Sequence, residues 1–447
     1  MRILTFSTLY PNAARPGHGI FVETRLRHLL ASGQVESRVV APVPWFPSSN
    51  PRFGEYAAHA GAPREERRHG IQVLHPRYPV LPKIGMTLAP FLLAQSVKPV
   101  IERVLAEYRF DLIDAHYFYP DGVAAVLLGR HLGKPVVITA RGTDVNLIPR
   151  YRLPRAMIRW AARGAAGMIT VAHALKDKLV ALGVPAGHIE VLRNGVDLQL
   201  FRPVDREGWR RRLGFRRTTL LLVGNLVPLK GHDLAIRALR LLPEMDLVII
   251  GNGPERAALD ALARESGVSD RVTFASAMAQ EDLHHYYGAA DALVLASSRE
   301  GWANVLLESM ACGTPVVASN VGGTPEVVTG PEAGVLMAER TPEALAQAVQ
   351  RLFARYPDRG ATRRYAEGFS WAATTAGQLR LFSRILQAAD KQGSDQTPNK
   401  PQMNIDETRT KNTLATESHG KHGIRSKDIS AAEPHGNTRN QEHGHCG

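Results

Sequence analysis

Apolar and polar positions alternate along the chain in the manner of an α/β protein. Short, nearly uninterrupted apolar runs, typical of strands buried on both faces, recur between longer stretches with helical apolar spacing. The predicted strands are residues 2–6, 39–41, 71–74, 112–115, 135–139 and 168–171 in the first half, and 220–223, 247–250, 272–274, 292–296, 316–318 and 335–337 in the second. This order predicts two parallel sheets, each with crossover helices.

Residues 189–203 (IEVLRNGVDLQLFRP) separate the two α/β patterns, because they combine a short strand, an Asn-Gly turn and an irregular stretch. We therefore predict a Rossmann-like N-terminal domain over residues 1–200 and a Rossmann-like C-terminal domain over 201–368. Helical apolar spacing predicts a last helix over residues 369–389. Residues 390–447 are polar with almost no aliphatic clustering, which predicts a disordered tail.

The strongest chemical signal lies in residues 298–325, SREGWANVLLESMACGTPVVASNVGGTP. Strands are predicted on both sides of its first part, and a helix is predicted to begin near Ala303. Glu300 then lies in the loop before the helix and Glu308 about one and a half turns into it. Loops of this kind open at the carboxyl ends of parallel strands, where such sheets bind ligands. Both carboxylates are therefore predicted to face one ligand.

Glycine and lysine residues in other loops suggest an anionic ligand. Gly322–Thr324 follow a predicted strand, and Gly17 and Gly19 lie between the first strand and the first helix, where backbone N–H groups can approach a phosphate. An ordinary flexible turn is the alternative for the loop at Gly19. Lys230 lies between a strand and a helix, where it would bring a compact charge to a phosphate, although the Walker spacing is absent.

Two histidines follow predicted strands of the first half. His116 ends the strand 112–115, and the next strand leads into residues 140–144 (ARGTD) at the same sheet edge. His116 is therefore a candidate for contact with substrate, with a purely structural role as the alternative. His173 follows a later strand, and we expect it to be structural.

Composition limits the class of protein. The chain has 447 residues, 44% of them hydrophobic, which is enough for two domains with sizeable cores. Its two cysteines, Cys312 and Cys446, provide neither a disulfide framework nor a metal cluster, which fits a reducing compartment. The first residues lack the regions of a signal peptide, and no apolar run is long enough to span a membrane. We expect a cytoplasmic protein.

The formal net charge of +13 is concentrated in the first half. Residues 1–200 carry 25 Lys and Arg against 14 Asp and Glu, and so contribute +11. Arginines at 150, 152, 155, 159 and 163 alternate with Met157, Ile158 and Trp160. Such a helix suits anionic lipid headgroups. The alternative is a core-packing helix with a solvated basic face. The apolar run within residues 79–99, flanked by Lys83 and Lys98 and too short to span, is predicted as a second membrane-surface element. No nucleic-acid-binding module is recognisable, so we expect no nucleic acid as a partner.

Two segments together resemble a known family. The pairing of residues 223–239 (VGNLVPLKGHDLAIRAL) with 298–328 is similar to the retaining glycosyltransferases of family 4, which have the GT-B fold of two facing Rossmann-like domains with a ligand cleft between them. The first thirty residues (TLYPN, then HGIFVETR) resemble the bacterial cell-surface polysaccharide branch that contains teichuronic-acid-type enzymes. The resemblance covers about residues 1–388, and it implies that the last helix crosses back to the N-terminal domain.

The resemblance also implies roles for individual residues. Glu308 would bind the ribose of a nucleotide diphosphate sugar, Glu300 the transferred sugar, and Lys230 the pyrophosphate. His116 matches a family histidine beside the sugar. The implied catalytic residues are His116, Lys230 and Glu300, and the implied donor-binding residues are Gly19, Asn225, Lys230, Glu300, Gly301, Asn304, Val305, Glu308 and Gly323. Asn225 stands where many relatives have an arginine, so either Lys230 holds the phosphates alone or Arg141 or Arg299 compensates.

The implied reaction moves a sugar from a nucleotide diphosphate sugar to a glycan or lipid-linked acceptor with retention of configuration, in bacterial surface polysaccharide synthesis. No cofactor and no metal are expected, since Lys230 and oriented N–H groups can stabilise the leaving group. Retention could arise from a double displacement or from same-face attack. Arg150, Arg155, Arg159 and Trp160 would hold the acceptor side at an anionic membrane surface, at the inner face of the cell membrane. The alternatives are a GT-B-fold nucleotide-sugar epimerase and a non-catalytic membrane-surface binding protein.

Overall fold

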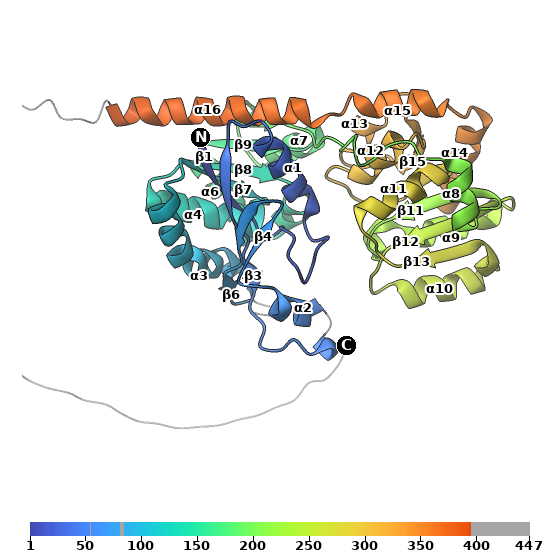
Figure 1. Ribbon diagram of the computed structural model, residues 1–447, viewed down its shortest axis with the longest axis horizontal. Coiled ribbons are helices and arrows are strands. Elements are labelled where there is room, and N and C mark those ends of the chain that lie inside the picture. Colours follow the sequence, from blue (N-terminus) through green and yellow to red (C-terminus); the bar gives the residue numbers. More distant parts are fainter. Residues whose placement is uncertain (54, 81–84, 395–447) are drawn as a thin grey trace, which may run out of the picture. The chain divides into compact units, whose positions relative to one another are not determined.

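The computed structural model describes residues 1–53, 55–80 and 85–394 of the 447. Within them lie two separate sheets of mainly parallel strands, one in each half of the chain, with helices packed on both faces (Figure 1). The prediction of an α/β chain with two Rossmann-like halves is confirmed. In the described residues no helix is both long enough and apolar enough to cross a bilayer.

The sheet of the first half has eight strands. Across the sheet they are β10 (Ile189–Val191), β9 (Gly167–Thr170), β8 (Val136–Ala140), β7 (Leu112–His116), β1 (Arg2–Phe6), β2 (Glu36–Val40), β5 (Ile71–Leu74) and β4 (Glu65–Arg68). All neighbours are parallel except β4 and β5. The pattern of apolar residues missed β4 because its sequence, EERR, has no apolar side chain to bury. A separate pair is formed by β3 (Val43–Pro44) and β6 (Arg77–Tyr78).

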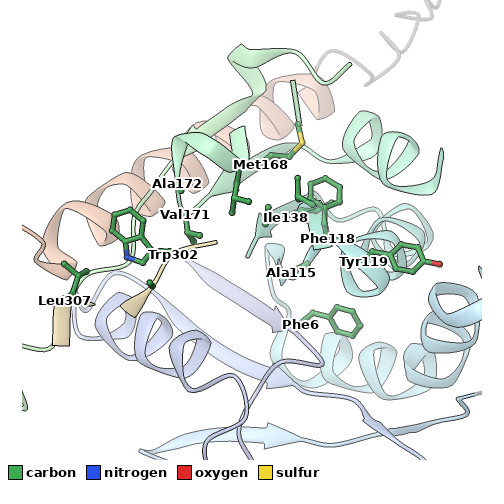
Figure 2. Packing of buried hydrophobic residues seen from close by; sticks show 14 of the residues in the cluster. Phe6, Ala115, Phe118, Tyr119, Ile138, Met168, Val171, Ala172, Trp302 and Leu307 are labelled. Carbon is green, nitrogen blue, oxygen red and sulfur yellow. The ribbon is translucent and has the colours of Figure 1, made fainter. Parts of the chain in front are cut away.

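Two layers of helices cover this sheet. The helices of the first half are α1 (Ile20–Leu30), α2 (Glu55–Gly61), α3 (Gly85–Tyr108), α4 (Val123–Leu132), α5 (Thr143–Asn146), α6 (Arg152–Gly164) and α7 (His173–Ala181). The side chains of Phe6, Ala115 and Ile138 point into the core beneath α3, α4 and α6 (Figure 2). On the opposite face Ile3 and Leu112 belong to a second core cluster with α1.

The sheet of the second half has six parallel strands. In order they are β13 (Val272–Ala275), β12 (Met245–Ile250), β11 (Thr218–Val223), β14 (Ala292–Leu295), β15 (Val316–Ser319) and β16 (Gly334–Met337). The helices are α8 (Arg206–Leu213), α9 (His232–Ala238), α10 (Arg256–Glu265), α11 (Gln280–Ala289), α12 (Asn304–Ala311), α13 (Thr324–Val327), α14 (Pro342–Ala354) and α15 (Arg359–Glu367).

Strand order reverses at one place in each sheet. The first strand of the first half, β1, lies between β2 and β7, and the first strand of the second half, β11, lies between β12 and β14. The loops at the carboxyl ends of these strands diverge to opposite faces and leave a crevice, which is where open α/β sheets bind ligands. The loops after β1, β7, β11 and β14 are therefore the first places to look for a site.

The last helix, α16 (Trp371–Ser394), belongs to the core of the first half. It packs against α1, and Leu381, Phe382 and Ile385 are buried in the same cluster as Ile3. The helix continues five residues beyond the predicted end at 389, so the prediction of disorder is wrong for residues 390–394. Asp, Lys and Gln are compatible with a helix, and polarity alone did not end it. The remainder of the predicted tail, 395–447, lies outside the described residues.

The two segments that connect the halves are bonded to each other. The N–H of Val196 donates to the carbonyl of Phe369 at 2.9 Å, and the hydroxyl of Thr374 donates to the carbonyl of Arg193. A Cβ on Gly195 would lie only 2.5 Å from the nitrogen of Trp371, so the backbones meet where a side chain has no room. We call these two paired segments, residues 193–196 and 369–374, the hinge.

Candidate functional site

Lys230 and Glu300 meet at the strand-order reversal of the second half. Lys230 ends a short 3-10 turn (Pro228–Lys230) after β11, and Glu300 lies in the loop after the neighbouring β14. The Nζ of Lys230 lies 2.7 Å from the Oε1 of Glu300. The N–H of Ser298 donates to the carbonyl of Leu229 at 2.8 Å, which fixes the two loops side by side. The structure thus brings together two residues that are 70 positions apart.

The loop of Glu300 also lies directly on the glycine pair after β15. A Cβ on Gly322, whose φ is +54°, would come within 1.9 Å of the carbonyl oxygen of Glu300. A Cβ on Gly323 would lie 2.4 Å from the carbonyl oxygen of Gly301. Only glycine permits this contact between backbones. The predicted role of the glycine pair was to approach an anion. The structure adds a second role, because the pair supports the loop of residues 296–303 that carries Glu300, called the acidic loop below.

Glu308 lies on the buried side of α12, facing α11. Its Oε2 accepts a hydrogen bond from the hydroxyl of Tyr287 at 2.8 Å, and its Oε1 accepts one from the Nε2 of Gln280 at 3.3 Å. Burial raises the pKa of Glu308 to about 7, although both hydrogen bonds oppose the increase. As predicted, Glu300 lies in the loop before α12 and Glu308 lies within that helix. The two carboxylates have different partners, Lys230 for Glu300 and Tyr287 and Gln280 for Glu308.

The raised pKa of Glu308 predicts how stability depends on pH. Between its ordinary value of 4.5 and about 7, the folded chain keeps a proton on Glu308 that the unfolded chain has lost. The contribution of Glu308 to the free energy of unfolding therefore falls as pH rises through this window. Glu308→Gln should remove that slope and be more stable than wild type above the window, by up to about 3 kcal/mol. Urea unfolding across the pH range measures this; parallel curves for the two proteins would contradict it.

Two buried aspartates shape the loops of the first half. Asp121 accepts hydrogen bonds from the N–H of Thr8 at 2.7 Å and from its hydroxyl at 2.9 Å, which holds the loop after β1 against the start of α4. Burial raises the pKa of Asp121 to about 8. Asp144 accepts from the N–H of Gly142 and from that of Phe118, each at 2.7 Å. It therefore joins the loops that follow β7 and β8.

His116 is buried in a charged cluster at the end of β7. Its Nε2 lies 3.2 Å from the Oδ2 of Asp114, and its Nδ1 lies 2.6 Å from the Nη2 of Arg141. Since an arginine can only donate, Nδ1 accepts and the ring proton is on Nε2. Burial lowers the pKa of His116 to about 4, and the charge of Arg141 acts in the same direction. A bond from this ring to a sugar would require one of these two contacts to break.

Arg141 lies where the two halves meet. The residue is 9% exposed, and its guanidinium contacts His116 on one side and lies 5.2 Å from the centre of the ring of Phe21 on the other. Its Nε has no partner among the described atoms. Burial lowers the pKa of Arg141 to about 9, and nearby Arg25 contributes to the lowering. The guanidinium of Arg141 faces the charges of Arg25, Asp114 and Asp144, so the two buried cations here are matched by two buried carboxyl groups.

Asn194 bridges the two halves from the hinge. Its Oδ1 accepts from the Nη1 of Arg141 at 3.3 Å, and its Nδ2 donates to the Oδ1 of Asn304, the first residue of α12, at 3.2 Å. The side chain of Asn194 is buried. Nearby, a Cβ on Gly301 would lie 2.1 Å from the carbonyl oxygen of Arg141. The acidic loop therefore touches the loop after β8 backbone to backbone.

The bridge predicts a measurable coupling. Asn194→Ala should lower the free energy of unfolding by about 2 kcal/mol, because the amide makes two buried hydrogen bonds. Asn304→Ala should cost less, and the double variant should cost less than the sum of the two, since the variants share one bond. Urea unfolding of the four proteins measures the cycle. The exposed Asn225→Ala is the control, expected within about 0.5 kcal/mol of wild type. Additive effects would contradict the bridge.

A second contact between the halves is made by Glu326 of α13. Its carboxylate accepts from the N–H groups of His173 and Ala174, at 3.0 and 2.9 Å, and so caps the start of α7. Arg193 of the hinge donates to the same carboxylate at 3.0 Å. Trp302, Ala172 and Val171 belong to the buried cluster that both halves share (Figure 2). The backbone N–H of His173 thus belongs to a helix start, while its side chain is exposed, so the structural role predicted for the imidazole stays a prediction.

The other predicted residues lie at or near the same loops. Gly19, with φ +67°, precedes α1, and a Cβ there would lie 2.4 Å from the carbonyl oxygen of Leu9. Asn225 is exposed in the loop after β11, and Val305 is half-buried at the start of α12. Their predicted contacts with a donor stay predictions.

The apolar side of α6 packs inward, so the predicted apolar contact of Ile158 with a membrane is wrong, while the contact of the arginines with lipid headgroups stays a prediction. Ile158 is fully buried in the core, and Trp160 is half-buried with the guanidinium of Arg130 4.6 Å from its ring centre. Arg150, Arg155 and Arg159 are exposed. The apolar residues of α6 thus match the alternative of a core-packing helix, and its basic face is exposed.

Sequence reasoning missed Asp114, Asp144, Asn194 and Glu326 as site residues. Asp114 gave one signal, because a charged residue inside an apolar strand needs a buried partner. Asp144 gave another, since an aspartate two residues after a glycine commonly accepts backbone N–H groups. Asn194 and Glu326 gave none, because their partners are more than 50 residues away along the chain. In the described residues no group of three or more His, Cys, Asp or Glu side chains is arranged to hold a metal.

Family models match both halves. Residues 56–200 match the model described as Glycosyltransferase Family 4, and residues 205–369 match the model of Glycosyl transferases group 1. The chain is 34% identical over 310 residues to a D-inositol 3-phosphate glycosyltransferase of Frankia alni, covering 63% of this chain and 75% of that protein. It is 30% identical over 363 residues to the teichuronic acid biosynthesis glycosyltransferase TuaC of Bacillus subtilis, covering 78% and 89%.

Solved structures share the fold. Sucrose-phosphate synthase from Thermosynechococcus elongatus has a TM-score of 0.71 at 22% identity, over 87% of this chain and all of that one. HepE of Anabaena in complex with UDP has a TM-score of 0.67 at 20% identity, over 86% of this chain and all of that one. A further HepE structure contains UDP-glucose, with a TM-score of 0.61, 20% identity and coverage of 88% and 100%. At this identity the likeness shows the fold alone.

Proposed function

Because the chain belongs to the family 4 glycosyltransferases of the GT-B class, and is therefore a transferase, we propose that it transfers a sugar from a nucleotide diphosphate sugar with retention of configuration. Membership excludes the alternative of a non-catalytic binding protein. The observation that carries the proposal is the contact of Lys230 with Glu300 at 2.7 Å, at the strand-order reversal where a ligand is expected.

A nucleotide diphosphate sugar matches the charges around these loops. Such a donor carries negative charge on its pyrophosphate and hydroxyl groups on its ribose and sugar. Lys230 favours the pyrophosphate, and the carboxylates of Glu300 and Glu308 can accept hydrogen bonds from the hydroxyl groups. HepE binds UDP and UDP-glucose in its own crystal structures, which supports a donor of this class.

In the proposed reaction the bond between C1 of the sugar and the phosphate oxygen breaks, and a bond from the acceptor oxygen to C1 forms on the same face. The departing phosphate takes the acceptor proton. Lys230 would neutralise the charge that develops on that phosphate, which is the largest electrostatic demand of the step. We favour same-face attack over double displacement, in which Glu300 would be the nucleophile. Lys230 donates a hydrogen bond to one carboxylate oxygen of Glu300, and a carboxylate paired in this way is a weaker nucleophile. No metal is needed for these roles.

For the acceptor we propose a glycan or lipid-linked glycan of bacterial surface polysaccharide synthesis, used at the cytoplasmic face of the membrane. The likeness to TuaC and the excess of basic residues in the first half support this. The inositol phosphate glycosyltransferases among the relatives make a phosphorylated small acceptor the competing choice.

The test is turnover of a donor panel. UDP-glucose, GDP-mannose and ADP-glucose are each incubated with the protein and with either a bacterial lipid extract or inositol phosphate, and the products are followed by NMR. We expect one donor to lose its nucleotide and to give a product with the same anomeric configuration as the donor. An inverted product would contradict the retaining reaction, and transfer to inositol phosphate alone would contradict the proposed acceptor.

A further inference from the structure

Large apolar side chains are exposed mainly on one part of the first half. Among the described residues ten large hydrophobic side chains are exposed, and seven of them are Trp45, Val80, Met86, Leu88, Phe91, Tyr151 and Leu153. Phe91 is 47% exposed and Leu153 59%. Exposed apolar residues that gather in this way mark an interaction surface, whereas scattered ones do not.

These residues lie close together although they come from three segments. Trp45 follows β3 and Val80 follows β6, the two strands of one pair, and the N–H of Trp45 donates to the carbonyl of Tyr78 at 2.8 Å. Helix α3 contacts β6. The hydroxyl of Tyr119 donates to the carbonyl of Met86 in α3 and lies 3.8 Å from the sulfur of Met157 in α6. Met157 is one turn from Leu153, so α3 and α6 begin side by side.

The apolar surface continues along a groove between α3 and α4. The groove has a volume of about 450 Å³, and Leu88, Phe91, Leu92, Leu127 and Leu128 line most of it. Lys98 and His131 lie at its far end, where both contact Glu102. That end is therefore balanced in charge, and the groove itself is apolar.

Unpaired positive charge borders the apolar residues. Arg150, Arg152, Arg155, Arg159 and Arg163 are all exposed. Within the part of the chain that the structure describes, none of them forms an ion pair. Residues 145–176 contain no aspartate or glutamate that could neutralise them. A surface with large apolar side chains beside uncompensated arginines matches an anionic lipid bilayer, which offers apolar depth and negative headgroups together.

We propose that the starts of α3 and α6, with Trp45 and Val80 beside them, form a docking surface for an anionic bilayer. Met86, Leu88, Phe91, Tyr151 and Leu153 enter the headgroup region, and the arginines of α6 contact lipid phosphates. The sequence predicted two separate membrane-surface elements, residues 79–99 and 150–163, and gave the apolar contact in the second to Met157, Ile158 and Trp160; the structure joins the starts of the two helices and replaces these three residues by Tyr151 and Leu153. The docking surface does not depend on the proposed sugar donor.

The test is sedimentation with vesicles. Vesicles of phosphatidylcholine alone are compared with vesicles of phosphatidylcholine and phosphatidylglycerol in equal amounts. We expect wild type to sediment with the second kind only. Replacing Arg152, Arg155 and Arg159 together by Gln should lower partition by about a hundredfold. The matched control replaces Arg211, Arg216 and Arg240 of the second half by Gln, with the same charge change, and should leave partition within about twofold of wild type, because these residues lie outside the docking surface.

A separate variant tests the contribution of the apolar side chains to vesicle binding. Phe91→Gln with Leu88→Gln should lower partition about tenfold, whereas Leu241→Gln, at a side chain that is also 47% exposed, should leave it unchanged. An equal loss of partition in both arginine triple variants would show that only net charge matters and would overturn the docking surface. A wild type that does not sediment with anionic vesicles would overturn it as well. Binding of duplex DNA in place of vesicles, lost in the first triple, would assign the arginines to nucleic acid and overturn the proposal.

Discussion

Lys230→Ala is expected to lower the turnover of the donor by about a hundredfold. A preorganised positive group at the leaving phosphate contributes on the order of 3 kcal/mol to stabilisation of the transition state, and no other lysine lies in the loops around Glu300. The loss should appear in kcat, because the charge on the phosphate grows as the bond to the sugar breaks. Steady-state release of the nucleotide measures it.

A second variant separates the role of the charge from that of the ion pair. Lys230→Ala leaves Glu300 without its partner, whereas Lys230→Ala with Glu300→Gln removes both charges. If Lys230 acts on the leaving group, the double variant should be no faster than the single one. Lys178→Ala, on an exposed position of α7, is the control and should keep wild-type turnover. Full recovery in the double variant would mean that Lys230 only neutralises Glu300.

Gly301→Ala is expected to lower turnover by a similar factor for a different reason. The added methyl group would lie 2.1 Å from the carbonyl oxygen of Arg141, which belongs to the other half of the chain. Backbone cannot yield as a side chain can, so the acidic loop and the loop after β8 must separate. A displacement of about 1 Å in a group that positions substrate can cost about a hundredfold in rate.

The matched substitution is Gly187→Ala. A Cβ at Gly187 would have no atom within 4 Å, so the same chemical change carries no clash and should leave turnover unchanged. Gly301→Ala should still bind a nucleoside diphosphate, because Lys230 and Glu308 lie in the second half. Loss of nucleotide binding together with turnover would show that the variant damages the second half itself.

The fold could be predicted from the sequence to the extent that strands are buried and apolar. The strands 112–115, 220–223 and 247–250 were found because their side chains are buried on both faces. The edge strand β4 could not be found, since charged residues there are held by pairing with β5 and not by burial. The end of α16 was missed because helix propensity and local composition disagreed at residues 390–394.

The site could be predicted only where chemistry and spacing coincide along the chain. Glu300, Glu308 and Lys230 lie in loops whose position follows from strand order, and the structure brings Lys230 and Glu300 into contact. The cluster of Asp114, His116 and Arg141 depends on the register of β7 beside β8, which no local pattern encodes. Because this register is not visible in the sequence, His116 was predicted to contact a sugar directly. In the structure its two ring nitrogens contact Asp114 and Arg141.

The measurement that tests the central claim most directly is a calorimetric titration of UDP, GDP and ADP in the presence of EDTA, on wild type and on Glu308→Ala. We expect one diphosphate to bind wild type without metal, and to bind the variant about tenfold to a hundredfold more weakly, because a charge-assisted hydrogen bond contributes about 1.5–3 kcal/mol. Binding of none of the three, or equal binding to both proteins, would contradict the assignment of these loops to a nucleotide sugar.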